Sequence, residues 1–109
     1  ILIVDRNKQA AMDYTEDCLR LNPLKEKFLS FGWEVESVNG HSINELTNVF
    51  SSIKKTKKRK PTVIIANTIK GKGVSFMEGN LKWHHSIPSD IEYKTAITEL
   101  SNNIGVDKL

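Results

Sequence analysis

Short unbroken apolar runs and amphipathic stripes follow one another along the chain. Ile1–Val4 and Thr62–Ala66 are apolar apart from the opening threonine of the second run, a pattern typical of parallel strands that are buried on both faces. Trp33–Val38 predicts a third and shorter strand. Together the three segments predict a parallel sheet.

The amphipathic stripes predict helices between and after these strands. Asn22-Pro23 is typical of a helix start, because Asn can cap a helix and Pro fits its first position, and Gly32 is typical of a helix end. Two Ser-x-x-Glu capping boxes, beginning at Ser42 and Ser89, predict two more helices. The residues expected in the core are Leu24, Phe28 and Phe31 with the neighbouring Trp33, then Ile43, Leu46, Val49, Phe50 and Ile53, then Tyr93, Ala96, Ile97 and Leu100.

The resulting order is strand, helix, strand, helix, strand, long loop, helix. This order predicts an α/β fold with a doubly wound parallel sheet. Residues 6–22 are predicted to be loop with a short helical turn. Residues 67–88, with three glycines, two histidines and a proline, are predicted to form a long functional loop.

Length and charge narrow the class of protein. The 109 residues make one small domain or a part of one, and because the chain begins inside an apolar run we expect it to belong to a longer polypeptide. The net charge is +3, but residues 54–60 hold six cations, and elsewhere ten cations face 13 acidic residues. We therefore expect a solvated basic run and no nucleic-acid-binding face.

The sequence shows neither a membrane-spanning segment nor a pair of cysteines that could form a disulfide. The longest aliphatic runs are four residues, too short to span a membrane. The single Cys18 cannot form an internal disulfide, which fits a cytoplasmic protein.

Two polar segments directly follow predicted buried strands. Because ligands of open α/β sheets bind at the carboxyl ends of the strands, both segments are expected at one edge. Asp5–Gln9 offers an amide oxygen and backbone carbonyls, which suit Mg²⁺ or Ca²⁺. Asn67–Gly73 offers backbone N–H groups beside lysines, which suit phosphate. From these residues alone, turns without a ligand remain an open interpretation, and such segments after a strand are commonly only turns.

Five segments, taken in order, resemble the transketolase family, in the second half of the domain that binds the diphosphate of thiamine diphosphate. The resemblance runs from residue 1 to about residue 100. The segments are Val4–Lys8, Pro23–Lys25 with Phe31–Val35, Asn39–His41, Lys60–Gly73 and Trp83-His84.

The resemblance implies a role for four residues. Asn7 would ligate Mg²⁺ through its side chain and lie near the diphosphate, and Gln9 would give its backbone carbonyl to the metal. Lys70 would contact the cofactor. His84 would reach cofactor and substrate as the catalytic imidazole, although His85 stands where the family usually has Gly.

The resemblance also implies what the chain does and what it lacks. We expect residues 1–109 to be a partial diphosphate-binding domain of an enzyme that transfers two-carbon ketol units between sugar phosphates. The family's Gly-Asp-Gly metal element and its pyrimidine-binding domain do not occur in the sequence, so we expect the chain to be inactive alone. It would act with the remaining domains or a partner subunit, in a homo- or hetero-oligomer.

Two other functions remain open at this stage. One is another thiamine-diphosphate enzyme, of the deoxyxylulose phosphate synthase or dihydroxyacetone synthase type. The other is a non-catalytic α/β interaction module that uses the basic run at residues 54–60 as its contact surface.

Overall fold

The computed structural model describes residues 1–55 and 60–104. Its elements are, in chain order, β1 (Leu2–Arg6), α1 (Thr15–Cys18), α2 (Leu24–Ser30), β2 (Glu34–Asn39), α3 (Ile43–Lys55), β3 (Thr62–Asn67), the 3₁₀ helix η1 (Leu81–His84) and α4 (Asp90–Ile104). They divide into two compact units, and each is described by itself. The sheet unit holds Ile1–Ala10 and Tyr14–Thr68, and the loop–helix unit holds Ala11–Asp13 and the chain from Ile69 onward.

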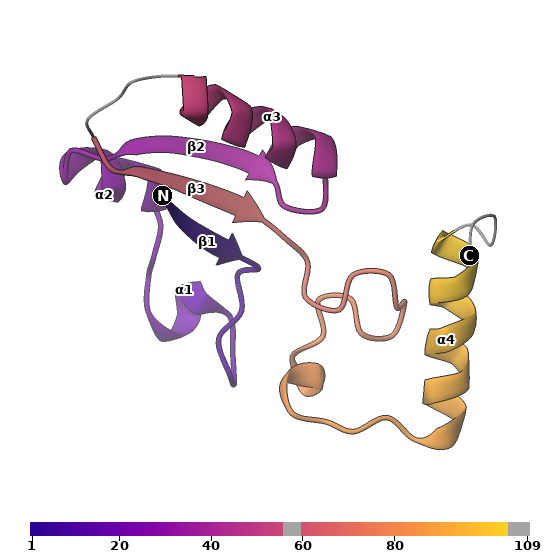
Figure 1. Cartoon of the computed structure of the whole chain (residues 1–109). Coiled ribbons are helices and arrows are strands. Elements are labelled where there is room, and N and C mark those ends of the chain that lie inside the picture. Colours follow the sequence, from indigo (N-terminus) through magenta and orange to yellow (C-terminus); the bar gives the residue numbers. More distant parts are fainter. Residues whose placement is uncertain (56–59, 105–109) are drawn as a thin grey trace. The chain divides into compact units, whose positions relative to one another are not determined.

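The sheet has three parallel strands in the order β1-β3-β2 (Figure 1). Arg6 of β1 and Asn39 of β2 are both register partners of Asn67 in β3. All three strands therefore end at the same level along the sheet. Both α2 and α3 pack against β2. The predicted α/β class and the parallel sheet are confirmed.

The core of the sheet unit is centred on β3. Val63 and Ile64 have no exposed surface, and Thr62, Ile65 and Ala66 are also buried. A strand that is paired on both edges and covered on both faces must be apolar throughout, as the unbroken run predicts. Burial of a Val or Ile side chain contributes about 1.5–3 kcal/mol each, so β3 is the main apolar anchor of the sheet.

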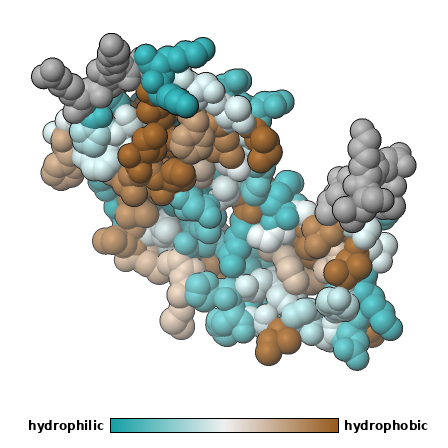
Figure 2. All heavy atoms as spheres, in the orientation of Figure 1, coloured by the Kyte–Doolittle hydropathy of each residue, from teal (hydrophilic) through white to brown (hydrophobic). Residues whose placement is uncertain are grey.

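The prediction that Ile1–Val4 is buried on both faces is wrong for this chain. Ile1 is 70% exposed and Ile3 is 53% exposed. The reason is position, because β1 is an edge strand and, within the described residues, pairs only with β3. Figure 2 shows apolar residues gathered on the surface of the part of the chain that carries the sheet.

Two expectations for the region around α2 are also corrected. The helix begins after Pro23, and no side-chain cap bond stabilises its first turn, so Asn22 is not the cap. Phe31 is 81% exposed, because the helix has already ended and Gly32, at φ +82°, turns the chain away. Phe28 and Trp33 do pack together, edge to face, with ring centroids 5.6 Å apart.

The first capping box, at the start of α3, forms only in part. The Glu45 backbone N–H donates to Ser42 Oγ at 3.2 Å. The Glu45 carboxylate instead accepts from the Asn39 N–H at 2.8 Å, so it ties α3 to the end of β2. Of the predicted apolar stripe on α3, Val49 is buried, whereas Ile43 at the first position is 74% exposed.

The second capping box is complete. The Ser89 N–H donates to Glu92 Oε2 at 2.8 Å, and the Glu92 N–H donates to Ser89 Oγ at 3.4 Å. In the helix that follows, Ala96 is buried as predicted, but Tyr93 is 58% exposed and Ile97 47% exposed. Helical spacing therefore predicted the buried position at Ala96, but it did not show how much of the same helix face stays exposed.

Two remaining sequence predictions concern charge and membranes. Lys54 and Lys55 form the last turn of α3, and residues 56–59 of the basic run lie outside the described residues. No helix in the described part of the chain combines the length and the apolar character needed to cross a bilayer.

The open edge of β1 leads to a prediction about the isolated chain. An uncovered apolar edge strand is a template for pairing with another chain, so we expect residues 1–109 alone to self-associate. Ile3→Lys puts a charge on this edge and is expected to shift the sedimentation profile toward the monomer. Ile43→Lys removes a still more exposed apolar side chain from α3 and is expected to leave association unchanged. A wild-type chain that sediments as a monomer and melts cooperatively would contradict this account.

Candidate functional site

The carboxyl ends of β1 and β3 are held together by polar contacts. The Thr68 backbone N–H donates to the Arg6 carbonyl at 3.3 Å, and the Thr68 hydroxyl donates to Asp5 Oδ1. On the other side of β3, Asn67 Nδ2 donates to Ser37 Oγ at 3.0 Å. The first residues after the two strands therefore share one edge, as the sequence predicted.

The segment after β1 forms a tight turn over Asn7, Lys8 and Gln9. The Gln9 backbone N–H donates to Asn7 Oδ1 at 2.9 Å, and Lys8 has φ +64°, a left-handed conformation that few non-glycine residues adopt. An amide oxygen has two lone pairs, so Asn7 Oδ1 retains one for a cation. The side-chain oxygen of Asn7 and the carbonyl of Gln9 are hard oxygen donors of the kind that Mg²⁺ prefers.

An ion pair between a buried arginine and a partly exposed glutamate lies directly beside this turn. Arg6 is 6% exposed, and its guanidinium donates to Thr15 Oγ1 at 2.8 Å and to Glu16 Oε1 at 2.9 Å. The Thr15 backbone N–H in turn donates to the Lys8 carbonyl at 2.9 Å. Sequence reasoning predicted residues 6–22 as loop with a short helical turn, which α1 provides, but it did not predict these contacts of Arg6, Thr15 and Glu16.

The Glu16 carboxylate also orders the chain that leads to α2. It accepts the backbone N–H groups of Leu21 and Asn22, each at 3.3 Å. The Lys27 ammonium donates to the Leu21 carbonyl at 2.9 Å. The polar segment between β1 and α2 is thus fixed by charge-assisted hydrogen bonds.

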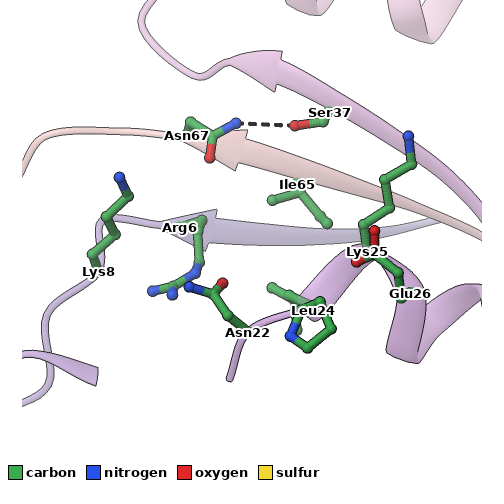
Figure 3. Close-up of a pocket in the computed structure, with 10 residues that line it drawn as sticks. Arg6, Lys8, Asn22, Leu24, Lys25, Glu26, Ser37, Ile65 and Asn67 are labelled. Carbon is green, nitrogen blue, oxygen red and sulfur yellow. Dashed lines mark hydrogen bonds between the residues drawn. The ribbon is translucent and has the colours of Figure 1, made fainter. Parts of the chain in front are cut away.

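A pocket of about 340 Å³ opens beside these residues in the sheet unit (Figure 3). Ile65 forms an apolar part of its wall, and the polar heads of Lys8 and Lys25 lie on different sides of it. Asn67 and Ser37 contribute neutral polar atoms, joined by the hydrogen bond drawn in the figure. The remaining lining residues are Arg6, Asn22, Pro23, Leu24 and Glu26.

The Gly-rich segment folds back on itself within the loop–helix unit. The Gly79 backbone N–H donates to the Lys70 carbonyl at 2.9 Å. Gly71 has φ +75°, and a Cβ at this position would lie 2.5 Å from the Met77 carbonyl oxygen, so only glycine fits without a shift. The glycine therefore has a structural role, which is compatible with close approach of a ligand to Lys70.

Two carboxylates hold this loop from its own unit. Glu78 Oε1 accepts the Gly73 backbone N–H at 3.0 Å. Glu99 of α4 accepts both the backbone N–H of Ser75, at 2.5 Å, and its hydroxyl, at 2.6 Å. The hydroxyl and then the backbone N–H of Ser75 lower the pKa of Glu99 below its ordinary value of 4.5, because both donate to the ionised form.

His84 ends the 3₁₀ helix η1 and is exposed. The helix is fixed by Trp83, whose Nε1–H donates to the Phe76 carbonyl at 3.0 Å and whose ring packs on Phe76 at 5.3 Å. Asn80 caps the helix by accepting the Lys82 N–H at 3.1 Å. The His85 ring stands beside that of His84, with centroids 6.1 Å apart.

The four predicted site residues fall into two groups. Asn7 and Gln9 share the turn after β1 in the sheet unit, whereas Lys70 and His84 belong to the loop–helix unit. Within the described residues, no three His, Cys, Asp or Glu side chains gather as a metal cluster.

Comparison with known proteins decides the family. Residues 1–107 match the family described as transketolase, thiamine diphosphate binding domain. The chain belongs to this family. The resemblance identified from five sequence segments is therefore confirmed, and so is the fold class that it implies.

Individual transketolases show the same relationship. The chain is 39% identical over 104 residues to an apulose-4-phosphate transketolase subunit of Phocaeicola vulgatus, covering 95% of this chain and 37% of that protein. It is 39% identical over 100 residues to 6-deoxy-6-sulfo-D-fructose transketolase subunit SqwG of a Clostridium species, covering 92% of this chain and 36% of that protein. The chain thus spans little more than a third of the length of these relatives.

A solved transketolase structure has the same fold. The crystal structure of transketolase from Campylobacter jejuni superposes with a TM-score of 0.77 at 31% sequence identity. The match covers 97% of this chain and 16% of that one. The transketolase fold thus accounts for almost the whole chain.

The Glu99 contact predicts a pH-dependent stability of the loop–helix unit. Because the folded-state pKa is depressed, the stabilisation is present above the ordinary pKa of about 4.5 and is lost as the pH falls through the lower folded-state value. Glu99→Gln should lower the melting temperature at pH 7, and this difference from wild type should narrow below about pH 4.5. Thermal melts from pH 7 to pH 3 test this, with the exposed Glu26→Gln as a control. A constant difference across that range would contradict the assignment.

Proposed function

We propose that this chain is part of an enzyme that transfers a two-carbon ketol unit between sugar phosphates, with thiamine diphosphate and Mg²⁺ as cofactors. The observation that carries the proposal is the turn after β1, where Asn7 Oδ1 and the Gln9 backbone are fixed around a left-handed Lys8. This turn lies in a chain that matches the thiamine diphosphate binding domain of transketolase.

The residues of the turn fit a magnesium ion. Mg²⁺ requires oxygen donors in a nearly octahedral arrangement, and Asn7 and Gln9 would supply a side-chain amide oxygen and a backbone carbonyl. The Lys8 carbonyl between them already accepts both the N–H and the hydroxyl of Thr15, which uses its two lone pairs, so we assign the metal contacts to the two flanking residues. The bound cofactor would supply an electron sink for breaking a carbon–carbon bond.

Lys70 and His84 would act on the organic ligands. Lys70 lies at the start of the folded-back Gly-rich loop, and we assign its ammonium to contact with the anionic cofactor. The exposed imidazole of His84 would polarise a substrate oxygen or move a proton at it, which makes His84 the proposed catalytic residue.

The relatives guide the choice of partner and substrate class. Two proteins of similar sequence are each named as one subunit of a transketolase that acts on a modified sugar. We propose that this chain likewise acts with further transketolase domains or a partner subunit, in the cytoplasm, and that residues 1–109 are a partial diphosphate-binding domain without activity of its own. The exposed apolar residues of β1 support packing against more protein.

The metal role of Asn7 predicts a cofactor-binding defect. In the complete enzyme, Asn7→Ala should raise the Mg²⁺ and thiamine diphosphate concentrations needed for half-maximal activity, because one metal ligand is lost. Part of the rate should return at high concentrations of both. Asn7→Asp keeps a side-chain oxygen and should bind better than Asn7→Ala, and Asn44→Ala, on the exposed face of α3, is the matched control. Normal cofactor binding by Asn7→Ala would remove the metal assignment.

The role of His84 predicts a different kinetic defect. His84→Ala should lower kcat at saturating cofactor by about 10²–10⁴-fold, as expected for loss of a general acid–base group, and added Mg²⁺ should not restore it. His85→Gly, which introduces the residue usual in the family, should be mild. If His84→Ala turns over normally and His85→Ala does not, the catalytic assignment belongs to the neighbouring histidine.

A further inference from the structure

Arg6 is a buried cation that the proposed chemistry does not use. It is the last residue of β1, directly before Asn7, and its side chain is 7% exposed. A buried charge is tolerated only where it is paired and hydrogen-bonded. The contacts of Arg6 therefore indicate what the charge does at this position.

The guanidinium joins two residues that lie nine and ten positions further along the chain. Nη1 donates to Thr15 Oγ1 at 2.8 Å, and Nη2 donates to Glu16 Oε1 at 2.9 Å. These two bonds use the fixed fork of the guanidinium, a geometry that Lys cannot reproduce.

Thr15 passes this restraint on to the turn. Its backbone N–H and its hydroxyl both donate to the Lys8 carbonyl, at 2.9 and 3.4 Å. The hydroxyl of Thr15 thus accepts from Arg6 and donates to Lys8, which satisfies one O–H donor and one acceptor site. The restrained carbonyl belongs to the one residue of the turn with a left-handed backbone, at φ +64°.

We propose that Arg6, Thr15 and Glu16 are positioning residues that hold the Asn7–Gln9 turn in its metal-binding conformation before the cation arrives. The proposal rests on the proposed function, since it assigns a purpose to the turn only if the turn binds a metal. An ordered turn presents its oxygen donors without the entropic cost of arranging them during binding. Groups that orient metal ligands in this way typically change metal affinity by about 10–100-fold when they are removed.

The test measures metal binding directly in the complete enzyme with thiamine diphosphate present. Mn²⁺ replaces Mg²⁺, and free Mn²⁺ is followed by electron paramagnetic resonance. Arg6→Gln, Arg6→Lys and Thr15→Val should each weaken Mn²⁺ binding by about 10–100-fold. At saturating Mg²⁺ the kcat of these variants should approach that of wild type. Arg20→Gln, a change of an exposed arginine in the same segment, should leave Mn²⁺ affinity unchanged.

A purely structural role would give a different pattern. The melting temperature of the variants would then fall, while the folded fraction bound Mn²⁺ normally, and this result would overturn the proposal. If Arg6→Gln does not fold, the nearly isosteric Thr15→Val still decides, because it removes the hydroxyl that links Arg6 to the Lys8 carbonyl. Wild-type affinity in this variant overturns the proposal. Asn7→Ala separates the positioning role from the metal site itself. If Asn7→Ala binds Mn²⁺ weakly while the Arg6 and Thr15 variants bind it normally, only the positioning role is rejected. If Asn7→Ala binds Mn²⁺ normally, the metal site itself is rejected.

Discussion

The parallel pairing of β3 with a neighbour on each side sets the geometry on which the rest of the sheet unit depends. Val63 and Ile64 of β3 have no exposed surface, so the strand cannot slip by one residue without moving polar neighbours into the core. Its last residue, Asn67, pairs with the last residues of both β1 and β2. The hydrophobic burial of one strand thereby fixes where the following turns begin, including the turn at Asn7.

Beyond the strand ends, hydrogen bonds to charged groups take over from apolar packing. Arg6 and Glu16 order the polar segment after β1. Glu99 holds the chain just after the Gly-rich loop by accepting two hydrogen bonds from Ser75. Such bonds have strict directional requirements, so they can specify the conformation of a turn more narrowly than burial can. This specificity suits loops that must present oxygen donors or side chains to a ligand.

The pattern of apolar and polar residues predicted the structural features that depend on residues close together in the chain. The unbroken run identified β3, and the position of Asn7 directly after a strand identified the candidate turn. Helical spacing predicted Phe31 to lie in the core, but its side chain is 81% exposed. The spacing identifies one face of a helix without showing whether another element covers that face. The bond from Arg6 to Glu16 spans ten residues and depends on how the intervening loop folds. No periodicity in the sequence carries that information, so the restraint on the turn emerged only from the structure.

The proposed magnesium site relates the turn to the protein that lies outside it. Mg²⁺ takes six oxygen donors in a nearly octahedral shell, and in the proposed site the turn would supply the side chain of Asn7 and the carbonyl of Gln9. The other positions would have to come from phosphate oxygens, water and protein outside this turn. The two proposed ligands lie in one short turn and share a single backbone conformation, so a change at Lys8 would displace both together. A single restraint on the Lys8 carbonyl therefore keeps both proposed donors aligned, and Thr15 provides it through two hydrogen bonds.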